Sequence, residues 1–242
     1  MKKILFAFCV LFVSIFAITS CDPATSTYEG YTQGLYTVDR NFVRPEMIDT
    51  FYKVDNLADF GLKSGDRAYI TMAYEVDNYF GPSSAKYRIK SVEGKLPVHG
   101  LTAASEIDSE KYSSPVSKLQ QVLINTEVAS AMWLWKKYQN INVGYYSNGT
   151  EGDFKLSPVG LSGDTLCFAL NAKIESGKIF MTSLLSYDIS SVVNMLPAED
   201  AKKLAALDSI YTKIATRWHD ATNDTIKMMY PFGGKYKNNL KN

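Results

Sequence analysis

The chain offers few residues for catalysis. Its 242 residues include two histidines, His99 and His219, and three cysteines. The imidazoles lie in separate regions and no Gly-x-Ser-x-Gly elbow is present, so neither a serine triad nor a histidine-based zinc site is indicated. Cys167 lies between Leu166 and Phe168, which is typical of a structural cysteine in a strand. We therefore predict no catalytic residue, no metal and no cofactor.

Paired carboxylates keep one hydrolytic reading open. Glu151 with Asp153, or Glu175 with Asp188, could supply the two carboxyl groups of a glycan hydrolase. Alternating acids at positions 106, 108 and 110 could in principle bind Ca²⁺, but they lack EF-hand spacing and indicate a solvated loop.

Residues suited to binding lie at predicted turns and along one strand. The 16 tyrosines and 12 phenylalanines include several at loop edges, where exposed aromatic rings stack on sugars or anchor a protein partner. Alternating cations on one strand face could meet phosphate or an acidic partner. Core packing and a solvated strand face are the ordinary alternatives. The candidate binding residues are Tyr79, Phe80, Tyr145, Tyr146, Lys86, Arg88 and Lys90.

The N-terminal segment has the composition of a bacterial lipoprotein signal peptide. Two lysines precede the apolar run 4–18, which at roughly 15 residues is shorter than the ~20 needed to span a bilayer. Ile18-Thr19-Ser20-Cys21 resembles a lipobox, so we expect residues 1–20 to be removed and Cys21 to carry the lipid. The alternative is an ordinary signal peptide that leaves Cys21 as a free thiol.

The charge balance excludes a dedicated nucleic-acid binder. Twenty-six basic and 25 acidic side chains give a net charge of +1, and removing residues 1–20 takes away two lysines and leaves −1. With Cys21 acylated, Cys167 has no disulfide partner. The expected partners are the membrane, through the lipid, and an envelope protein or glycan.

Alternating hydrophobicity predicts a mainly β protein. In 66–76, Ala68 and Ile70 fall on one face, whereas Arg67 and Thr71 fall on the other. We expect further strands at 47–54, 86–92, 96–101 and from 140, a hairpin of 165–170 with 179–186, and a strand within 222–232 before a frayed tail. Residues 114–137 suit helix or strand, and we favour part strand. Apolar residues spaced by three and four predict one amphipathic helix over 197–218.

The order of these pieces resembles the NigD-like lipoproteins. The resemblance rests on Cys21, Gly65-Asp66-Arg67, Tyr87-Arg88-Ile89, Trp135 with Tyr138-Gln139-Asn140-Ile141-Asn142-Val143, and Ser186-Tyr187-Asp188-Ile189-Ser190. It implies an N-terminal OB-like barrel followed by a C-terminal β-sandwich, with a helix longer than the usual link. We expect a signal peptide at 1–20, a tether at 21–33, the barrel at 34–112 and the sandwich at 113–242.

The same resemblance implies an envelope lipoprotein rather than an enzyme. We expect a non-catalytic protein- or glycan-binding accessory module, with a bacteriocin-associated immunity role as the alternative. Outer-membrane anchoring on the periplasmic face is favoured, because no dense acidic run follows Cys21. Asp-Ser/Thr-aliphatic tripeptides also place possible O-glycosylation at Thr165, Ser209 and Thr225.

Overall fold

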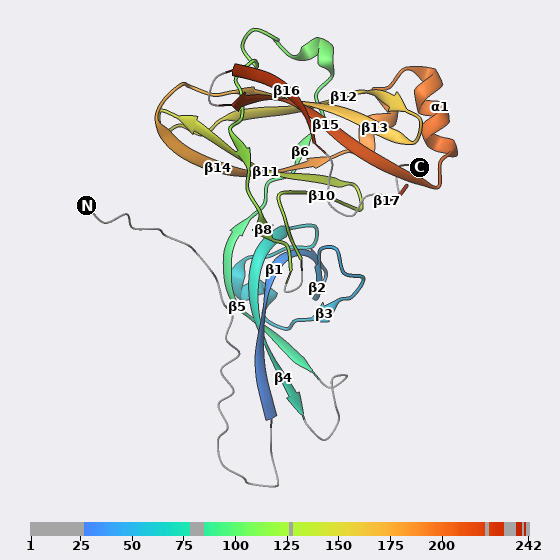
Figure 1. Ribbon diagram of the computed structural model, residues 1–242. Coiled ribbons are helices and arrows are strands. Elements are labelled where there is room, and N and C mark those ends of the chain that lie inside the picture. Colours follow the sequence, from blue (N-terminus) through green and yellow to red (C-terminus); the bar gives the residue numbers. More distant parts are fainter. Residues whose placement is uncertain are drawn as a thin grey trace, which may run out of the picture.

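A computed structural model describes residues 27–77, 85–125, 128–220, 223–229, 236–238 and 240. These residues form two β units stacked one above the other, with a single α-helix on the C-terminal unit (Figure 1). The mainly β fold with an OB-like and a sandwich part, predicted from the alternation and the family resemblance, is confirmed. Cys21, Tyr79 and Phe80 lie outside the described residues.

The N-terminal unit is one curled five-stranded sheet. Its strand order is β3-β2-β1-β4-β5, and all neighbouring pairs are antiparallel. A bridge between Val54 and Tyr87 joins the two edge strands, and the Asn56 side chain bonds both backbone groups of Ile89, which closes the curl. The strands are β1 (Thr27–Asp39), β2 (Phe42–Pro45), β3 (Tyr52–Lys53), β4 (Arg67–Asp77) and β5 (Lys86–Lys95), with a 3-10 turn at Leu57–Phe60.

The alternating segments became β4 and β5, but two other expectations for this unit were wrong. Residues 27–33, assigned to the tether, form the first half of β1 and pair with β4. The strand expected over 47–54 is a turn, entered at Met47 with φ 63°, and only β3 at its end is extended. Because β2 and β3 pair in antiparallel fashion, the chain has to reverse between them.

Two facing sheets form the C-terminal sandwich. One has the order β10-β11-β14-β6, with β7 beside β11, and the other has the order β12-β13-β15-β16, with β17 beside β15. Their inward side chains form one core that includes Tyr145, Leu185, Phe168 and Ile214. The strands are β6 (His99–Gly100), β7 (Lys118–Leu119), β10 (Met132–Trp135), β11 (Tyr138–Ser147), β12 (Asp153–Ser162), β13 (Thr165–Lys173), β14 (Ile179–Asp188), β15 (Ser209–Asp220), β16 (Asn223–Met229) and β17 (Tyr236–Lys237).

The hairpin predicted from 165–170 and 179–186 is wrong. β13 pairs with β12 and β15 in one sheet, whereas β14 pairs with β11 in the other. The connection between them packs on β11, because Asn148 N–H donates to Glu175 O at 3.1 Å and a Cβ on Gly177 would lie 2.2 Å from Ser147 O. The sequence correctly indicated a turn at 175–178, but this turn connects the two facing sheets and not two strands of one hairpin.

The predicted helix over 197–218 is also much shorter than expected. Helix α1 (Ala198–Ala206) has one buried side chain, Leu204, and β15 follows it almost at once. Ile210, Thr212 and Ile214 point inward at every second residue. Several apolar residues in this segment fit both the three-and-four spacing of a helix and the period of two of a strand. The β-branched residues among them favour a strand.

The C-terminal tail was expected to fray, yet Asn238 and Leu240 are buried. The Asn238 amide donates to Leu204 O at 2.8 Å and to Leu207 O at 2.9 Å. The tail therefore donates hydrogen bonds to two carbonyls at the end of α1, where the regular hydrogen bonding of the helix stops.

The chain passes between the two units more than once. After β5, residues 97–117 wrap the sandwich, where Thr102 N–H donates to Leu156 O and Ser117 N–H to Gly144 O. The small hairpin of β8 (Val122–Leu123) and β9 (Ala129–Ser130) then returns to β1, because Leu35 N–H donates to Ile124 O at 2.7 Å. Residues 114–125 and 128–137 are thus short strands and loops, as favoured from the sequence, and the boundary expected at 112/113 lies within the sandwich.

Candidate functional site

A buried ion pair fixes the contact between the two units. Arg67 at the start of β4 and Glu46 after β2 are both fully buried. Arg67 donates through Nε to Glu46 Oε1 at 2.9 Å, and its Nη2 contacts the same oxygen. The sequence placed Arg67 on the solvent face of its strand, which is wrong because the sandwich covers that face.

The sandwich completes the shell of this ion pair. Trp133 Nε1 donates to Glu46 Oε2 at 2.8 Å, and Arg67 donates to Asn140 Oδ1 at 2.9 Å and to Ser186 Oγ. Burial raises the pKa of Glu46, while Arg67 and Trp133 oppose that rise. The side chains of Arg67, Trp133 and Asn140 all donate to the carboxylate, so the site satisfies its ionised form.

Residues from three of the segments that carry the family resemblance meet in this cluster. They are Arg67, Asn140 and Ser186, and the ring of Tyr138 lies 4.3 Å from the Arg67 guanidinium carbon. The cluster is sealed from solvent, so the surface available to a partner lies elsewhere.

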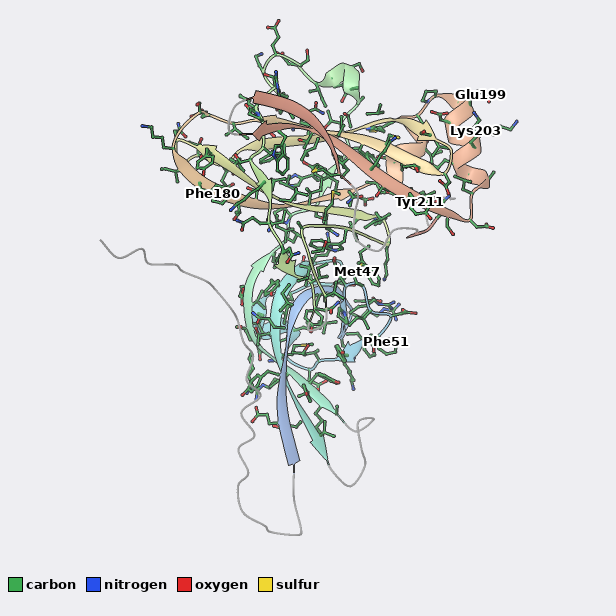
Figure 2. All side chains as sticks on the ribbon, in the orientation of Figure 1. Met47, Phe51, Phe180, Glu199, Lys203 and Tyr211 are labelled. Atoms are coloured by element: carbon green, nitrogen blue, oxygen red, sulfur yellow. The ribbon has the colours of Figure 1, made fainter. Side chains whose placement is uncertain are left out.

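The best candidate surface is an aromatic platform at the far end of β11 and β14, which we define as Tyr146, Phe180 and Lys118. Tyr146 lies directly opposite Phe180 across the ladder, and their rings meet edge to face at 5.3 Å. Tyr146 is 52% exposed and Phe180 36%. Ile179 is 54% exposed, but it lies opposite Ser147 and its side chain therefore points to the other face of the sheet. Figure 2 shows Phe180 at the opposite end of the C-terminal unit from Glu199 and Lys203 of α1.

Backbone and charge position the platform. Gly144 lies beneath Phe180, where a Cβ would come within 2.5 Å of the ring. Lys118 Nζ lies 4.4 Å from the Phe180 ring centroid, within cation–π range. Tyr145 points the other way: it is buried, packs against Phe154, and its hydroxyl pairs with Ser183 Oγ at 3.0 Å. Of this predicted pair, only Tyr146 faces solvent.

The platform suits a protein side chain better than a sugar ring. A sugar stacks on a flat, open ring face, whereas Lys118 covers one face of Phe180 and Tyr146 meets it at an interplanar angle of 67°. Exposed aromatic and aliphatic groups with a neighbouring cation are the usual anchors of protein interfaces.

A cleft of about 660 Å³ opens on another side of the sandwich, between β12 and β14. Asp153 at its rim accepts a hydrogen bond from the Tyr112 hydroxyl, and this bond raises the pKa of Tyr112. Its volume lies within the range of ligand sites. The lining residues are Pro97, His99–Thr102, Glu151–Lys155 and Thr182–Leu185.

The two carboxylate pairs considered for hydrolysis fare differently. Glu151 and Asp153 line the same cleft. Glu175 and Asp188 lie beside opposite ends of β11, a strand of ten residues that spans roughly 30 Å, which is too far for a catalytic pair. Burial raises the pKa of Asp188, but its bonds to Lys137 and Ser190 outweigh this and hold the pKa below its ordinary value.

The remaining candidates are dispersed. Lys86, Arg88 and Lys90 are all exposed on β5, and Lys90 lies 3.8 Å from a Glu29 oxygen. Thr165 and Ser209 are half-buried, and the side chain of Thr225 lies outside the described set. Cys167 is half-buried, with Sγ 3.5 Å from Thr165 O.

The described residues hold neither a metal-binding cluster nor a membrane-spanning helix. No group of three or more His, Cys, Asp or Glu side chains in this part of the chain could hold a metal ion. Asp108 in the acidic loop instead pairs with Lys111 at 2.9 Å, and this bond lowers the pKa of Asp108. Among the helices described, none is long and apolar enough to cross a bilayer.

Several solved structures have a fold similar to that of this chain. A NigD-like immunity protein from Bacteroides caccae matches 88% of this chain and 98% of its own, with a TM-score of 0.51 and 16% identity. The fold is that of a NigD-like protein. A candidate lipoprotein from Bacteroides fragilis matches 85% of this chain and 98% of its own, with the same TM-score and 16% identity.

A third structure, an uncharacterised protein from Parabacteroides merdae, covers 87% of this chain and 99% of its own at 9% identity, with a TM-score of 0.51. No protein-family model and no curated protein matches the sequence. The resemblance to the NigD-like family is therefore confirmed at the level of the fold.

Sequence reasoning found Tyr146 but missed the residues that make it a platform. Phe180 lies just after the turn at 175–178, and that position was the available signal. Its pairing with β11 could not be seen while β14 was assigned to a hairpin with β13. The role of Gly144 depends on the same cross-strand register.

Proposed function

We propose that this protein is a non-catalytic, lipid-anchored envelope module that binds a partner protein through the platform of Tyr146, Phe180 and Lys118. The observation that carries the proposal is the exposure of Tyr146 and Phe180 side by side on a rigid two-strand ladder. Aromatic side chains that are held in a cross-strand pair lose little conformational entropy on binding, which favours their use as anchors.

The anchoring half of the proposal rests on Cys21 and the lipobox before it. The fold shared with a candidate lipoprotein supports it. β1 begins at Thr27, so the folded body would follow the acylated cysteine by only a few residues. We place the protein at the outer membrane, facing the periplasm.

A photo-crosslinking amino acid at position 146 tests the binding half in living cells. The matched control carries the same group at Tyr31, which is 60% exposed on β1 of the other unit. We expect a discrete protein adduct from position 146 only, and its loss when Phe180→Ala is added. Equal adducts from both positions, or none from 146, would contradict the proposal.

Cys21→Ser tests the anchor. Metabolic labelling with an alkynyl fatty acid should mark the wild type and not the variant, and the variant should appear in the soluble periplasmic fraction. Labelling that persists in Cys21→Ser would place the lipid elsewhere.

An immunity-type role is the second candidate, and one observation favours it: the fold is shared with a NigD-like immunity protein. In that case the partner would be a secreted killing factor. Deletion should sensitise cells in competition with neighbouring strains, and Phe180→Ala should not restore resistance. Unchanged sensitivity would remove this role while leaving other partners open.

A further inference from the structure

Strand β14 has one open edge. It pairs with β11 along its whole length, but on its other side β6 pairs only with Tyr187 and Asp188. The chain leaves this edge at Pro97, which has no N–H to donate, and Leu96 N–H instead donates to Arg67 O at 2.7 Å in the other unit. Within the described part of the chain, residues 179–186 therefore have no strand on their second side.

This edge lacks the features that normally discourage pairing. Its eight residues, Ile-Phe-Met-Thr-Ser-Leu-Leu-Ser at 179–186, include no charge and no proline, and their register with β11 is continuous. The facing edge strand β12 differs, because it contains Pro158 and a register shift before Gly160. Exposed edges without charge, proline or bulge are templates for strand addition.

The cleft runs along this edge. It is lined by the four consecutive residues Thr182–Leu185 and by the five consecutive residues Glu151–Lys155. Neighbouring side chains of a strand point to opposite faces, so a cavity that touches every residue in a run lies against the strand's edge. The cleft is thus a slot between the edge strands of two facing sheets.

The walls of the slot favour an extended peptide with alternating character. Phe154, Leu101 and Leu185 present apolar surface toward the core. Glu151 and Asp153 are exposed at the rim, and Glu151 has no ion pair among the described residues. An added strand would direct alternate side chains to these two environments.

We propose that an extended segment of the partner protein adds to the open edge of β14 within this slot, with a basic side chain beside Glu151. This inference rests on the proposed protein-binding function and specifies the form of the partner. Main-chain hydrogen bonds would give affinity, and the alternating walls would give selectivity.

Panning a phage-displayed library of random nonapeptides against the purified protein tests the inference. Counter-selection uses the Thr182→Lys variant, which places a charge at an exposed position of the edge strand. The matched control is Ser162→Lys, at an exposed position of β12 outside the slot. We expect enriched peptides that alternate apolar and polar residues and include Lys or Arg.

The enriched peptide is then synthesised with and without N-methyl groups on alternate residues. Binding should fall about tenfold or more on N-methylation, because the ladder loses two or more hydrogen bonds. The affinity of the unmodified peptide should fall by a similar factor for Thr182→Lys and stay within about twofold for Ser162→Lys. For Glu151→Gln it should fall about two- to fivefold.

No enrichment over Thr182→Lys, or binding that N-methylation leaves unchanged, would overturn strand addition. An adduct from position 146 that persists in Thr182→Lys would leave the proposed function standing and remove this inference alone. If the protein that carries the crosslinker at position 146 and no other substitution forms no adduct, the proposed function and strand addition would both be contradicted.

Discussion

Phe180 packs on the bare backbone of Gly144: a Cβ at position 144 would lie 2.5 Å from Cζ of the ring and 3.2 Å from Cγ of Lys118. The residue opposite Gly144 is Thr182, not Phe180, so the ring leans diagonally along the ladder. The glycine thereby sets where Phe180, and the Lys118 cation beside it, meet solvent.

Gly144→Ala should therefore displace the ring and reduce the adduct from position 146 at least about threefold. The cost in stability should stay below about 1 kcal/mol, because the far end of an exposed side chain can move. Crosslinking yield and the urea midpoint measure the two effects. Gly94→Ala is the control, since a Cβ there meets nothing within 4 Å. Equal yields from the two variants would contradict this role for Gly144.

Arg67→Met should be among the most damaging single substitutions. It leaves Glu46 buried without its cation, which costs about 3–5 kcal/mol. Adding Glu46→Gln should recover part of that loss, because the unpaired charge is removed. Denaturant unfolding of the two variants measures both steps. A loss under about 1 kcal/mol for Arg67→Met would mean that the pair is not sealed from water.

The sequence predicted strands well wherever one face met solvent and the other met a core. β4 and β5 followed from alternation, because the N-terminal sheet is half-buried. β11 followed from alternation as well, although all its residues except Tyr138 and Tyr146 are buried in the structure. Arg67 was misplaced, because contact between units cannot be read from the period of one strand.

Pairing was harder to predict than strand content. The turn at 175–178 is equally compatible with a hairpin and with a crossing to the facing sheet, and only its contacts with Ser147 and Asn148 at the end of β11 distinguish the two. The platform and the open edge of β14 both depend on that pairing. The sequence could therefore supply Tyr146 and Glu151, but not the strand that relates them.

Asn238→Ala should destabilise the sandwich by about 1–3 kcal/mol. The substitution leaves the carbonyls of Leu204 and Leu207 without the amide that now donates to both. Asn238→Asp has nearly the same size but cannot donate, so it should lose a similar amount. Urea midpoints at an unchanged m-value measure the effect. Wild-type stability in both variants would mean that the tail does not hold α1.

The pair of Asp188 and Lys137 should make stability depend on pH. Lys137 Nζ lies 2.6 Å from Asp188 Oδ2, and the bonds to Lys137 and Ser190 overcome burial to lower the pKa of Asp188. A carboxyl whose pKa is lower in the folded state contributes stability above its unfolded pKa, and that contribution is lost as pH falls through the folded pKa. Asp188→Asn should therefore cost about 0.5–1 kcal/mol near pH 7 and almost nothing near pH 2.

Chemical denaturation of the wild type and Asp188→Asn at several pH values would measure this difference. The control is Asp49→Asn, because the Asp49 side chain is 97% exposed and lies 3.6 Å from Arg44. Its effect should stay within a few tenths of a kcal/mol at every pH. A gap between wild type and Asp188→Asn that stays constant from pH 7 to pH 2 would mean that Asp188 acts through packing. In that case the charge of Asp188 would not be what holds the end of β14 beside β11.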